Sequence, residues 1–229
     1  MSDVSHWPSH PSALRALQDE LGALRPQPWQ APDHGTVGGC FVCFERGGSG
    51  RGTTGDPGWA AATVMAGARV LGAHGSVGAA GAPYLSGFLA AREGPLLEAA
   101  VAGLETLPDV LLVNATGRDH PRRAGLALHL GWVCGVPTVG VTHRPLSAAG
   151  EEPGPQAGSQ SPLVIEGDQV GWWVRTRTRA RPVAVSTGWR TDADTALRVI
   201  RCLVPARART PEPIRQARRL ARTARSQSG

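Results

Sequence analysis

The chain has 229 residues, 41% of them hydrophobic, and a formal net charge of +6 in which every basic residue is arginine. This composition excludes an intrinsically disordered chain, and no apolar stretch is long enough to cross a bilayer. A basic chain is compatible with a nucleic-acid partner but does not establish one. We expect a single cytoplasmic domain over residues 1–229 with no membrane attachment, since the first residues lack the pattern of a signal peptide.

The first third of the chain predicts one helix and three strands. Leucines at helical spacing predict a helix over 12–25 with Ser12 as its cap, and a Pro-rich connector follows to about residue 34. Apolar, β-prone segments at 36–45, 59–66 and 68–78 predict an antiparallel meander. Cys40 and Cys43 would point to opposite faces of the first strand. Together with Cys134 and Cys202 they lack the second paired spacing of a zinc site, so reduced cysteines are expected.

The middle of the chain predicts helices alternating with buried strands. A turn at 83–84 leads into an amphipathic helix ending near residue 104. The continuous apolar runs 108–115 and 136–143 are typical of strands buried on both faces. The helical segment 122–135 lies between them and closes on Gly135. This order indicates a parallel pair joined by a crossover helix.

The last third predicts an exposed loop, a hairpin, a helix and a tail. The loop covers about 147–162, and the hairpin 170–188 is expected to carry a row of alternating side chains on one face, Trp173, Arg175, Arg177 and Arg179. A helix over 192–204 would be capped by Asp192 or Asp194. Residues 207–229 are expected as a basic tail that is helical at best, with a frayed end. The whole order describes an α/β fold, a ribonuclease H-like mixed central sheet flanked by helices.

The segment "LLVNATGRDHPRRAGLALHLG" places an unexpected residue at the end of a buried strand. A strand that ends in a Gly-containing loop and a His-Pro-Arg-Arg run is a platform for a charged catalytic group. The residue at its end is Asn114, whose amide cannot take a negative charge. Any function proposed for the chain has to account for the missing carboxylate at this position.

Several segments, taken in order, resemble the endonuclease V family over residues 38–218. They are "PYLSGFLAAREGPLLEAA", "PDVLLVNATGRDHPRRAGLALHLG", "GVPTVGVTHRPL", "VGWWVRTRTRARPVAVSTGWR" and "TPEPIRQA". They are similar to the family's PYIPG wedge and FREG helix start, its VDG-x-G-x-x-HPR loop, its IGVAK strand and its VSPGHR strand end. The resemblance implies an enzyme that binds inosine-containing nucleic acid and cuts 3′ to the lesion with Mg²⁺.

The same resemblance shows that most of the metal-binding positions are changed. The family's first Asp falls at Phe41, the Asp of its VDG motif at Asn114, and the His of its VSPGHR motif at Trp189. The Lys of IGVAK falls at His143, and only the acid of FREG is kept, as Glu93. Mg²⁺ needs several hard oxygen ligands, so Glu93 alone implies a weak or absent metal site. We expect no cofactor, or Mg²⁺ if the chain is active.

The base-recognition positions resemble the family more closely. Tyr84, the only tyrosine, falls on the wedge that fills the gap left by a flipped base, and Ser86 replaces the motif's second proline. Arg122 and Arg123 at a helix start are candidates to meet a phosphate. Ala115 replaces a glycine, which adds a methyl group to the pocket. The residues that the resemblance places in base or nucleic-acid binding are Pro83, Tyr84, Leu85, Gly87, Leu89, Gly117, His120, Arg122, Leu126 and Leu146.

Four functions remain open on the sequence. The first is a catalytically degenerate endonuclease V-like protein, expected as a monomer, that binds single-stranded or lesion-containing DNA or RNA with an inosine-type base, or a purine-like ligand. The second is an active Mg²⁺-dependent repair endonuclease with substitute ligands among Glu45, Asp119 and Asp192. The third is a different enzyme in the inherited pocket. It would use nucleophilic or acid–base groups near that pocket, namely Cys40, Cys43, His120 and His143. The fourth is a partner-binding subunit that uses the Arg-rich strand and tail.

Overall fold

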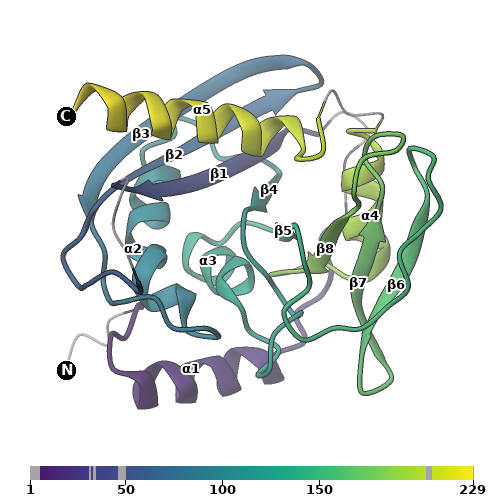
Figure 1. Cartoon of the computed structure of the whole chain (residues 1–229), viewed down its shortest axis with the longest axis horizontal. Coiled ribbons are helices and arrows are strands. Elements are labelled where there is room, and N and C mark those ends of the chain that lie inside the picture. Colours follow the sequence, from purple (N-terminus) through teal and green to yellow (C-terminus); the bar gives the residue numbers. More distant parts are fainter. Residues whose placement is uncertain (1–5, 31, 33–34, 46–49, 205–207, 229) are drawn as a thin grey trace.

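The computed structural model describes residues 6–30, 32, 35–45, 50–204 and 208–228. They form a sheet with helices on both faces (Figure 1). In chain order the elements are α1 (Pro11–Ala23), β1 (Val37–Phe44), β2 (Pro57–Ala66), β3 (Arg69–Ala79), α2 (Leu89–Ala102), β4 (Val110–Val113), α3 (Leu126–Cys134), β5 (Thr138–Thr142), β6 (Gln160–Ile165), β7 (Asp168–Val174), β8 (Val183–Thr187), α4 (Ala193–Arg201) and α5 (Glu212–Gln227).

The eight strands are ordered β3-β2-β1-β4-β5-β8-β7-β6, and the expected ribonuclease H-like mixed sheet is confirmed. β1, β2 and β3 form the predicted antiparallel meander. β4 runs parallel to both β1 and β5. The predicted crossover helix between β4 and β5 is α3, which ends at Gly135 with a φ of 69°, a left-handed conformation that glycine adopts without strain.

The helices cover the sheet in two layers. α2 and α3 pack on one face, where Cys40 joins a core with Leu97, Leu111 and Leu130. α4 and α5 cover the other face, and α5 crosses β1 and β2 (Figure 1). Phe41 and Cys43 point to this second face, so the predicted opposite orientation of Cys40 and Cys43 is confirmed. α1 packs on α3 at the edge of the first layer.

One expectation for the ends of the chain is wrong. Ser12 does not cap α1: the helix begins with Pro11 at its first position, where the missing N–H costs nothing, and His10 is the cap residue. The basic tail, expected as helical at best, contains α5, a helix of 16 residues. Ile214, Ala217 and Ala221 share one face of α5 and are buried against the sheet, which holds the helix in place. By contrast, Asp192 caps α4 as predicted, accepting a hydrogen bond from the Thr195 N–H.

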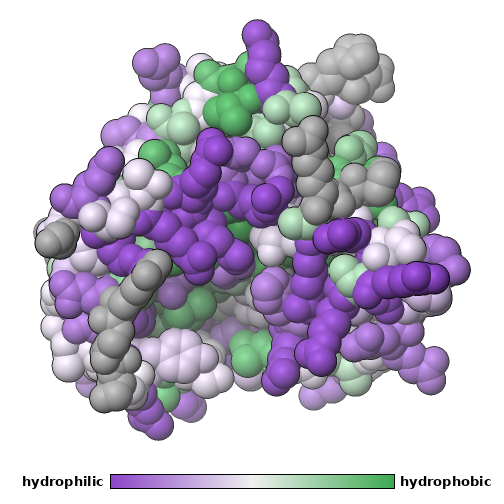
Figure 2. Space-filling view, turned by 45° about the horizontal axis from the view of Figure 1, so that its top comes forward, coloured by the Kyte–Doolittle hydropathy of each residue, from purple (hydrophilic) through white to green (hydrophobic). Residues whose placement is uncertain are grey.

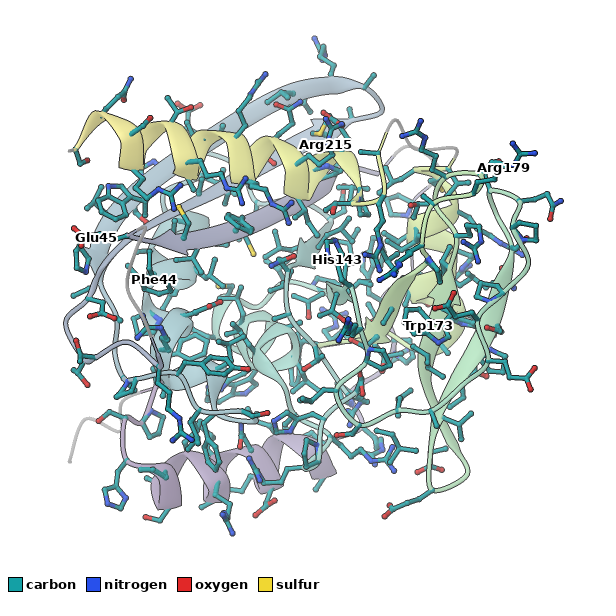
Figure 3. All side chains as sticks on the ribbon, viewed as in Figure 1. Phe44, Glu45, His143, Trp173, Arg179 and Arg215 are labelled. Atoms are coloured by element: carbon teal, nitrogen blue, oxygen red, sulfur yellow. The ribbon has the colours of Figure 1, made fainter. Side chains whose placement is uncertain are left out.

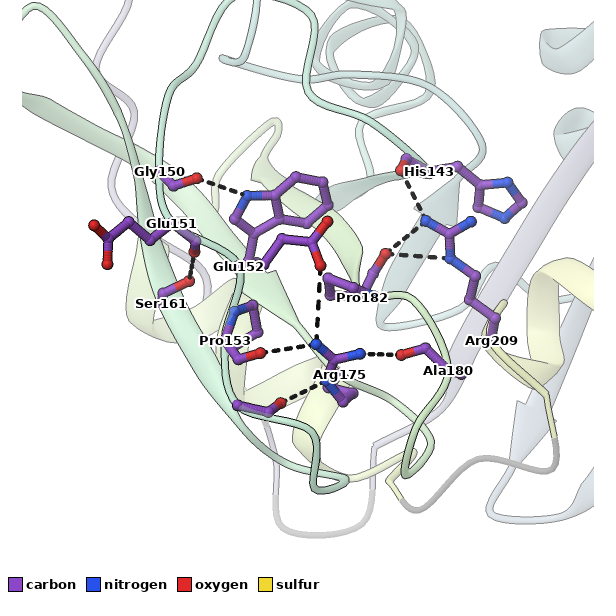
Figure 4. A network of polar contacts seen from close by, with 12 residues as sticks. His143, Gly150, Glu151, Glu152, Pro153, Ser161, Arg175, Ala180, Pro182 and Arg209 are labelled. Carbon is purple, nitrogen blue, oxygen red and sulfur yellow. Dashed lines mark hydrogen bonds and ion pairs between the residues drawn. The ribbon is translucent and has the colours of Figure 1, made fainter.

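The hairpin was predicted correctly as β7 and β8, but its arginine row is wrong. β7 ends at Val174, so Arg177 and Arg179 lie in the following turn rather than on a strand face, and Arg179 projects from it (Figure 3). Arg175 is buried and donates hydrogen bonds to the carbonyls of Pro153, Gly154 and Ala180 (Figure 4). It therefore fastens the segment expected as an exposed loop, and the unpredicted strand β6 begins within the last residues of that segment.

Candidate nucleic-acid site

A cavity of about 210 Å³ opens where the parallel strands β4 and β5 end. The register pairs Cys40 with Val113, so Phe41 and Asn114 stand side by side one residue further along β1 and β4. Asn114 lies in the cavity wall, and its amide has no hydrogen-bond partner among the described residues. The full lining is Gln18, Tyr84, Ser86, Gly87, Leu89, Ala90, Asn114, Ala115, Thr116, His120, Gly125, Leu126, Thr142, Arg144, Pro145 and Leu146.

Most of the residues expected at the base site border this cavity. Pro83, Leu85, Gly117 and Arg122 do not line it. The Gly117 N–H instead donates to the Ser186 Oγ at 2.8 Å, which anchors the loop after β4 to β8. The expected residues that do line the cavity are Tyr84, Gly87, Leu89, His120, Leu126 and Leu146.

The carbonyl oxygen of Gly87 organises one wall of the cavity. It accepts hydrogen bonds from Gln18 Nε2, His120 Nε2 and Arg122 Nη2, each at 3.0 Å. Gly87 has a φ of 77°, a backbone conformation that disfavours any residue with a side chain at this position. The wall is therefore held rigid by side chains that come from α1 and from the loop before α3.

His120 serves this wall as a neutral imidazole. Burial lowers its pKa to about 4, so the ring is uncharged at neutral pH. Its Nε2 lies on the Gly87 carbonyl oxygen and its Nδ1 faces the Arg122 backbone N–H at 3.2 Å, which assigns the proton to Nε2. Both ring nitrogens are occupied, so His120 holds structure here and is not a free acid–base group.

Tyr84 stands at the rim of the cavity and is partly exposed to solvent. Its residue is 48% exposed, while its backbone N–H is fixed by a 2.7 Å hydrogen bond to the Arg51 carbonyl. An aromatic ring in this position is available to stack on a base at the cavity mouth.

The two arginines expected to meet a phosphate are engaged within the protein. Arg122 binds Gln18 Oε1 at 2.7 Å as well as the Gly87 carbonyl, and its guanidinium lies over the Phe88 ring. Arg123 donates to the Ile165 carbonyl and pairs with Glu166 and Asp168. Neither guanidinium is turned to the cavity, so the expected phosphate role of this pair is not supported.

The residues at the family's metal-binding positions bring together few acidic groups. Within the described ranges, no three His, Cys, Asp or Glu side chains are grouped so as to hold a metal ion. Glu93 lies on the α2 side, near the Cys40 thiol, and burial raises the pKa of its carboxyl to about 8. Glu93 is the one acidic side chain kept at these positions.

On the opposite face, arginine stands beside the position of the first metal-binding Asp. The guanidinium carbon of Arg218, on α5, lies 4.8 Å from the centre of the Phe41 ring, and that of Arg222 lies 5.9 Å from it. Burial, together with the positive charges of Arg209 and Arg218, lowers the pKa of His143. The sequence motifs did not single out Arg218, although it directly follows the matching segment "TPEPIRQA".

The expected place of Trp189 in this group is wrong. β8 runs antiparallel to β5, so the residues after β8 lie beside the beginning of β5, whereas Asn114 and His143 follow the ends of β4 and β5. The Thr138 N–H donates to the Trp189 carbonyl at that opposite edge. The Trp189 ring packs there with Leu21, Ala124 and Leu128.

The carboxylates suggested as substitute metal ligands either bind other groups or lie away from Asn114. The carboxylate of Asp119 is fully buried and accepts hydrogen bonds from the backbone N–H groups of Leu146, Ser147 and Ala148 at 2.7–2.8 Å. Asp192 caps α4. Glu45 is exposed at the end of β1, far from His143 (Figure 3). These carboxylates do not converge on Asn114.

The thiol groups offer little support for a nucleophilic enzyme. Cys40 is fully buried in the core, and burial together with the nearby Cys134 and Glu93 raises the pKa of its thiol. Burial also raises the pKa of Cys134 to about 12. A thiol protonated at neutral pH is a weak nucleophile. Cys43 points to the α5 face, away from the cavity side of the sheet.

Known proteins match both the sequence and the fold. The sequence profile of the endonuclease V family matches residues 26–219. Endonuclease V of Azotobacter vinelandii is 38% identical over 96% of this chain and 97% of its own. The crystal structure of endonuclease V from Streptomyces avermitilis is 37% identical, with a TM-score of 0.85 over 97% of this chain and 96% of that one.

A more distant structure shares the fold at lower identity. It is endonuclease V of Ciona intestinalis, solved in complex with a DNA containing an inosine. It is 21% identical, with a TM-score of 0.76 over 95% of this chain and 98% of its own. With the profile match over most of the chain and two bacterial relatives above 35% identity, the chain belongs to the endonuclease V family.

Proposed function

We propose that this chain binds nucleic acid carrying an inosine-type base and does not cut it by metal-dependent hydrolysis. The observation that carries the proposal is a cavity beside a strand edge that lacks acidic side chains. Tyr84 and Gly87 border a hollow of about 210 Å³, while Phe41 and Asn114 stand side by side at the positions that the resemblance assigns to two metal-binding acids.

The cavity suits a flat base with both donors and acceptors. Leu89, Leu126 and Leu146 supply apolar walls, and the Tyr84 ring at the rim is available to stack. The Asn114 amide offers an N–H donor and a carbonyl acceptor, and both are without a partner among the described residues. A carboxylate at the same place would offer acceptors only, so the Asp-to-Asn difference favours hydrogen bonding to a base edge.

The loss of metal-dependent cutting rests on the donor set. Phe41 has no ligand atom, the Asn114 amide oxygen is neutral, and Glu93 is the one acid kept at these positions. Removing water from Mg²⁺ requires several anionic oxygens, which this set does not supply. The nearby Arg218 guanidinium adds a positive charge that repels a dication.

Selective binding in the presence of a chelator tests the proposal. Matched single-stranded DNA and RNA oligonucleotides, with inosine or adenosine at one position, are titrated with the protein in EDTA and followed by fluorescence anisotropy. We expect tighter binding to the inosine strands, and loss of that preference in Asn114→Ala. Equal affinity for inosine and adenosine in both DNA and RNA would reject base recognition. Binding that appears only when Mg²⁺ is added would favour the active endonuclease instead.

A further inference from the structure

α5 carries more positive charge than its surroundings neutralise. Arg215 pairs with Glu212 on the same helix, and Arg225 donates to the Phe44 carbonyl at 2.9 Å. Arg218, Arg219 and Arg222 have no acidic partner among the described residues. Unpaired arginines along one helix point to an anionic partner.

Two of these arginines are held in place by an aromatic ring. The guanidinium groups of Arg218 and Arg222 both lie over Phe41, at 4.8 and 5.9 Å from its centre. The two positions are four residues apart, one turn of α5, so both side chains reach the same ring. Cation–π contact restricts the two flexible side chains before any ligand arrives.

The guanidinium of Arg218 has a buried N–H group without a hydrogen-bond acceptor among the described residues. Its Nε is buried and has no hydrogen-bond partner within the described part of the chain. Burial and the charges of Arg222 and Arg215 lower the pKa of its guanidinium. A buried N–H donor without an acceptor is unfavourable, and an anion would both accept from it and offset the neighbouring charges.

The same arginines line a groove on the surface of α5. It has a volume of about 410 Å³ and is bordered by Arg215, Arg218, Arg219, Arg222, Thr223 and Ser226. The Thr223 hydroxyl adds a further donor to the guanidinium groups, while the Ser226 hydroxyl donates to the Thr223 carbonyl. Figure 2, which turns the α5 side of the molecule forward, shows hydrophilic side chains gathered across that face around a hollow.

His143 lies near both the cavity and α5. Its neighbour Arg144 lies in the cavity wall, and the charges of Arg209 and Arg218 act on the His143 ring. His143 Nε2 lies 3.2 Å from the Thr210 Oγ1, two residues before α5 begins. The cavity wall and the charged Arg218 of α5 are therefore both neighbours of this one residue.

We propose that Arg218 and Arg222, seated on Phe41, form a metal-independent binding site for the backbone phosphate of a nucleic-acid strand whose base enters the cavity. The inference rests on the proposed function. Forked guanidinium donors match phosphate oxygens, and phosphate contacts position a strand without reading its sequence. The arginine pair thus binds the phosphate, as a metal ion would, but it does not promote hydrolysis.

The test measures binding of two 12-nucleotide single-stranded DNAs, one unmodified and one with a single deoxyinosine, in EDTA over a range of salt concentrations. An Arg218→Ala/Arg222→Ala variant is compared with Arg69→Ala/Arg201→Ala, which removes two exposed arginines from β3 and α4. We expect the first variant to weaken binding of both strands at least about tenfold. The slope of log K against log salt should fall by about 0.7 for each phosphate that the variant no longer neutralises. The control should bind nearly as the natural protein does.

Two further readouts separate the phosphate site from loss of folding and from base recognition. Arg218→Lys keeps the charge but not the fork, and it should bind with an affinity between those of the natural protein and the double variant. Equal affinity and salt slope in the Arg218/Arg222 variant and its control would overturn the site, even if inosine is preferred. The natural protein could bind both strands equally while the Arg218/Arg222 variant still binds them more weakly. That result would reject the proposed function but keep the phosphate site. No binding of either strand would overturn both.

Discussion

The guanidinium of Arg218 covers the ring of Phe41 at the place where the endonuclease V resemblance expects a metal-binding carboxylate. The resemblance expects negative charge here, whereas this chain has a charged group on α5 above an aromatic group on β1. On the proposed function, this strand edge attracts anions rather than a dication. That proposal has measurable consequences for base recognition and catalysis, and the buried groups nearby have consequences for stability.

The Glu93→Gln variant should lose a pH dependence of stability. The folded-state pKa of Glu93 is raised to about 8. Its contribution to the free energy of unfolding is therefore fully present below the unfolded-state pKa of about 4.5, and it is lost as the pH rises from there through 8. His120 and His129, with folded pKa values lowered to about 4, change stability in the opposite sense below pH 6.5. The useful window is therefore pH 6.5 to 8.

Thermal unfolding across that window provides the measurement. The melting temperature of the natural protein should fall as pH rises, and that of Glu93→Gln should change much less. Glu105→Gln, an exposed residue after α2, is the matched control and should behave as the natural protein does. Parallel curves for all three proteins would show that the Glu93 carboxyl is already ionised at neutral pH.

Tyr84→Ala should reduce affinity for inosine-containing strands without unfolding the protein. Stacking of an aromatic side chain on a base is worth about 1–3 kcal/mol, so the affinity should decrease roughly 5- to 150-fold. Since Tyr84 is half-exposed, the melting temperature of the variant should change by little. Tyr84→Phe keeps the ring and should retain most of the affinity. If the alanine variant bound as tightly as the phenylalanine variant, Tyr84 would be a surface turn residue only.

Asp119→Asn should destabilise the protein rather than impair a metal-dependent step. Its carboxylate receives three backbone N–H groups from residues 146–148 and holds the loop that contributes Leu146 to the cavity. Hydrogen bonds to a charged group contribute about 1.5–3 kcal/mol, and an amide in this position can satisfy only part of the set. We expect urea unfolding to show a decrease in stability of about 2 kcal/mol or more. Glu45→Gln, exposed and remote from this loop in the sequence, should unfold as the natural protein does. If Asp119→Asn unfolded at the same urea concentration as the natural protein, Asp119 would have no structural role in this loop.

The prediction of this fold from the sequence succeeded where a local pattern determines the outcome. The apolar runs of β4 and β5, the helix between them and the glycine that ends it are all local signals, and they predicted the parallel pair correctly. β6 was missed because its residues are stabilised by pairing with β7, an interaction between segments rather than a pattern within one. The α5 segment looked like a tail because its arginines outnumber the few small and apolar residues on its buried face.

The candidate site was only partly predictable for a related reason. Tyr84 and His120 border the cavity as the resemblance suggested, since short motifs carry them there. Trp189 was misplaced because the direction of β8 relative to β5 is a property of the sheet and not of the motif. Arg218 was overlooked because its contact with Phe41 joins positions 177 residues apart in the chain.

Gly39→Ala should loosen α5 and, with it, the arginines over Phe41. A methyl group at Gly39 would overlap the backbone of Pro213 and Ile214, and backbone atoms cannot move aside without shifting the helix. Overpacking of this kind costs about 1–3 kcal/mol. Gly72→Ala, on β3, meets no atom within 4 Å and is the matched control. Stability and strand affinity should both fall in the first variant only. Equal behaviour of the two variants would mean that α5 does not depend on its packing against β1.

Cleavage of an inosine-containing strand by the natural protein is the measurement that tests the central claim most directly. Excess protein is incubated with end-labelled DNA and RNA strands in Mg²⁺, in Mn²⁺ and in EDTA, and strand length is read on a denaturing gel. We predict full-length strands under all three conditions. Shortened strands that require the metal, and that disappear with Glu93→Ala, would contradict the account and identify the chain as an active endonuclease.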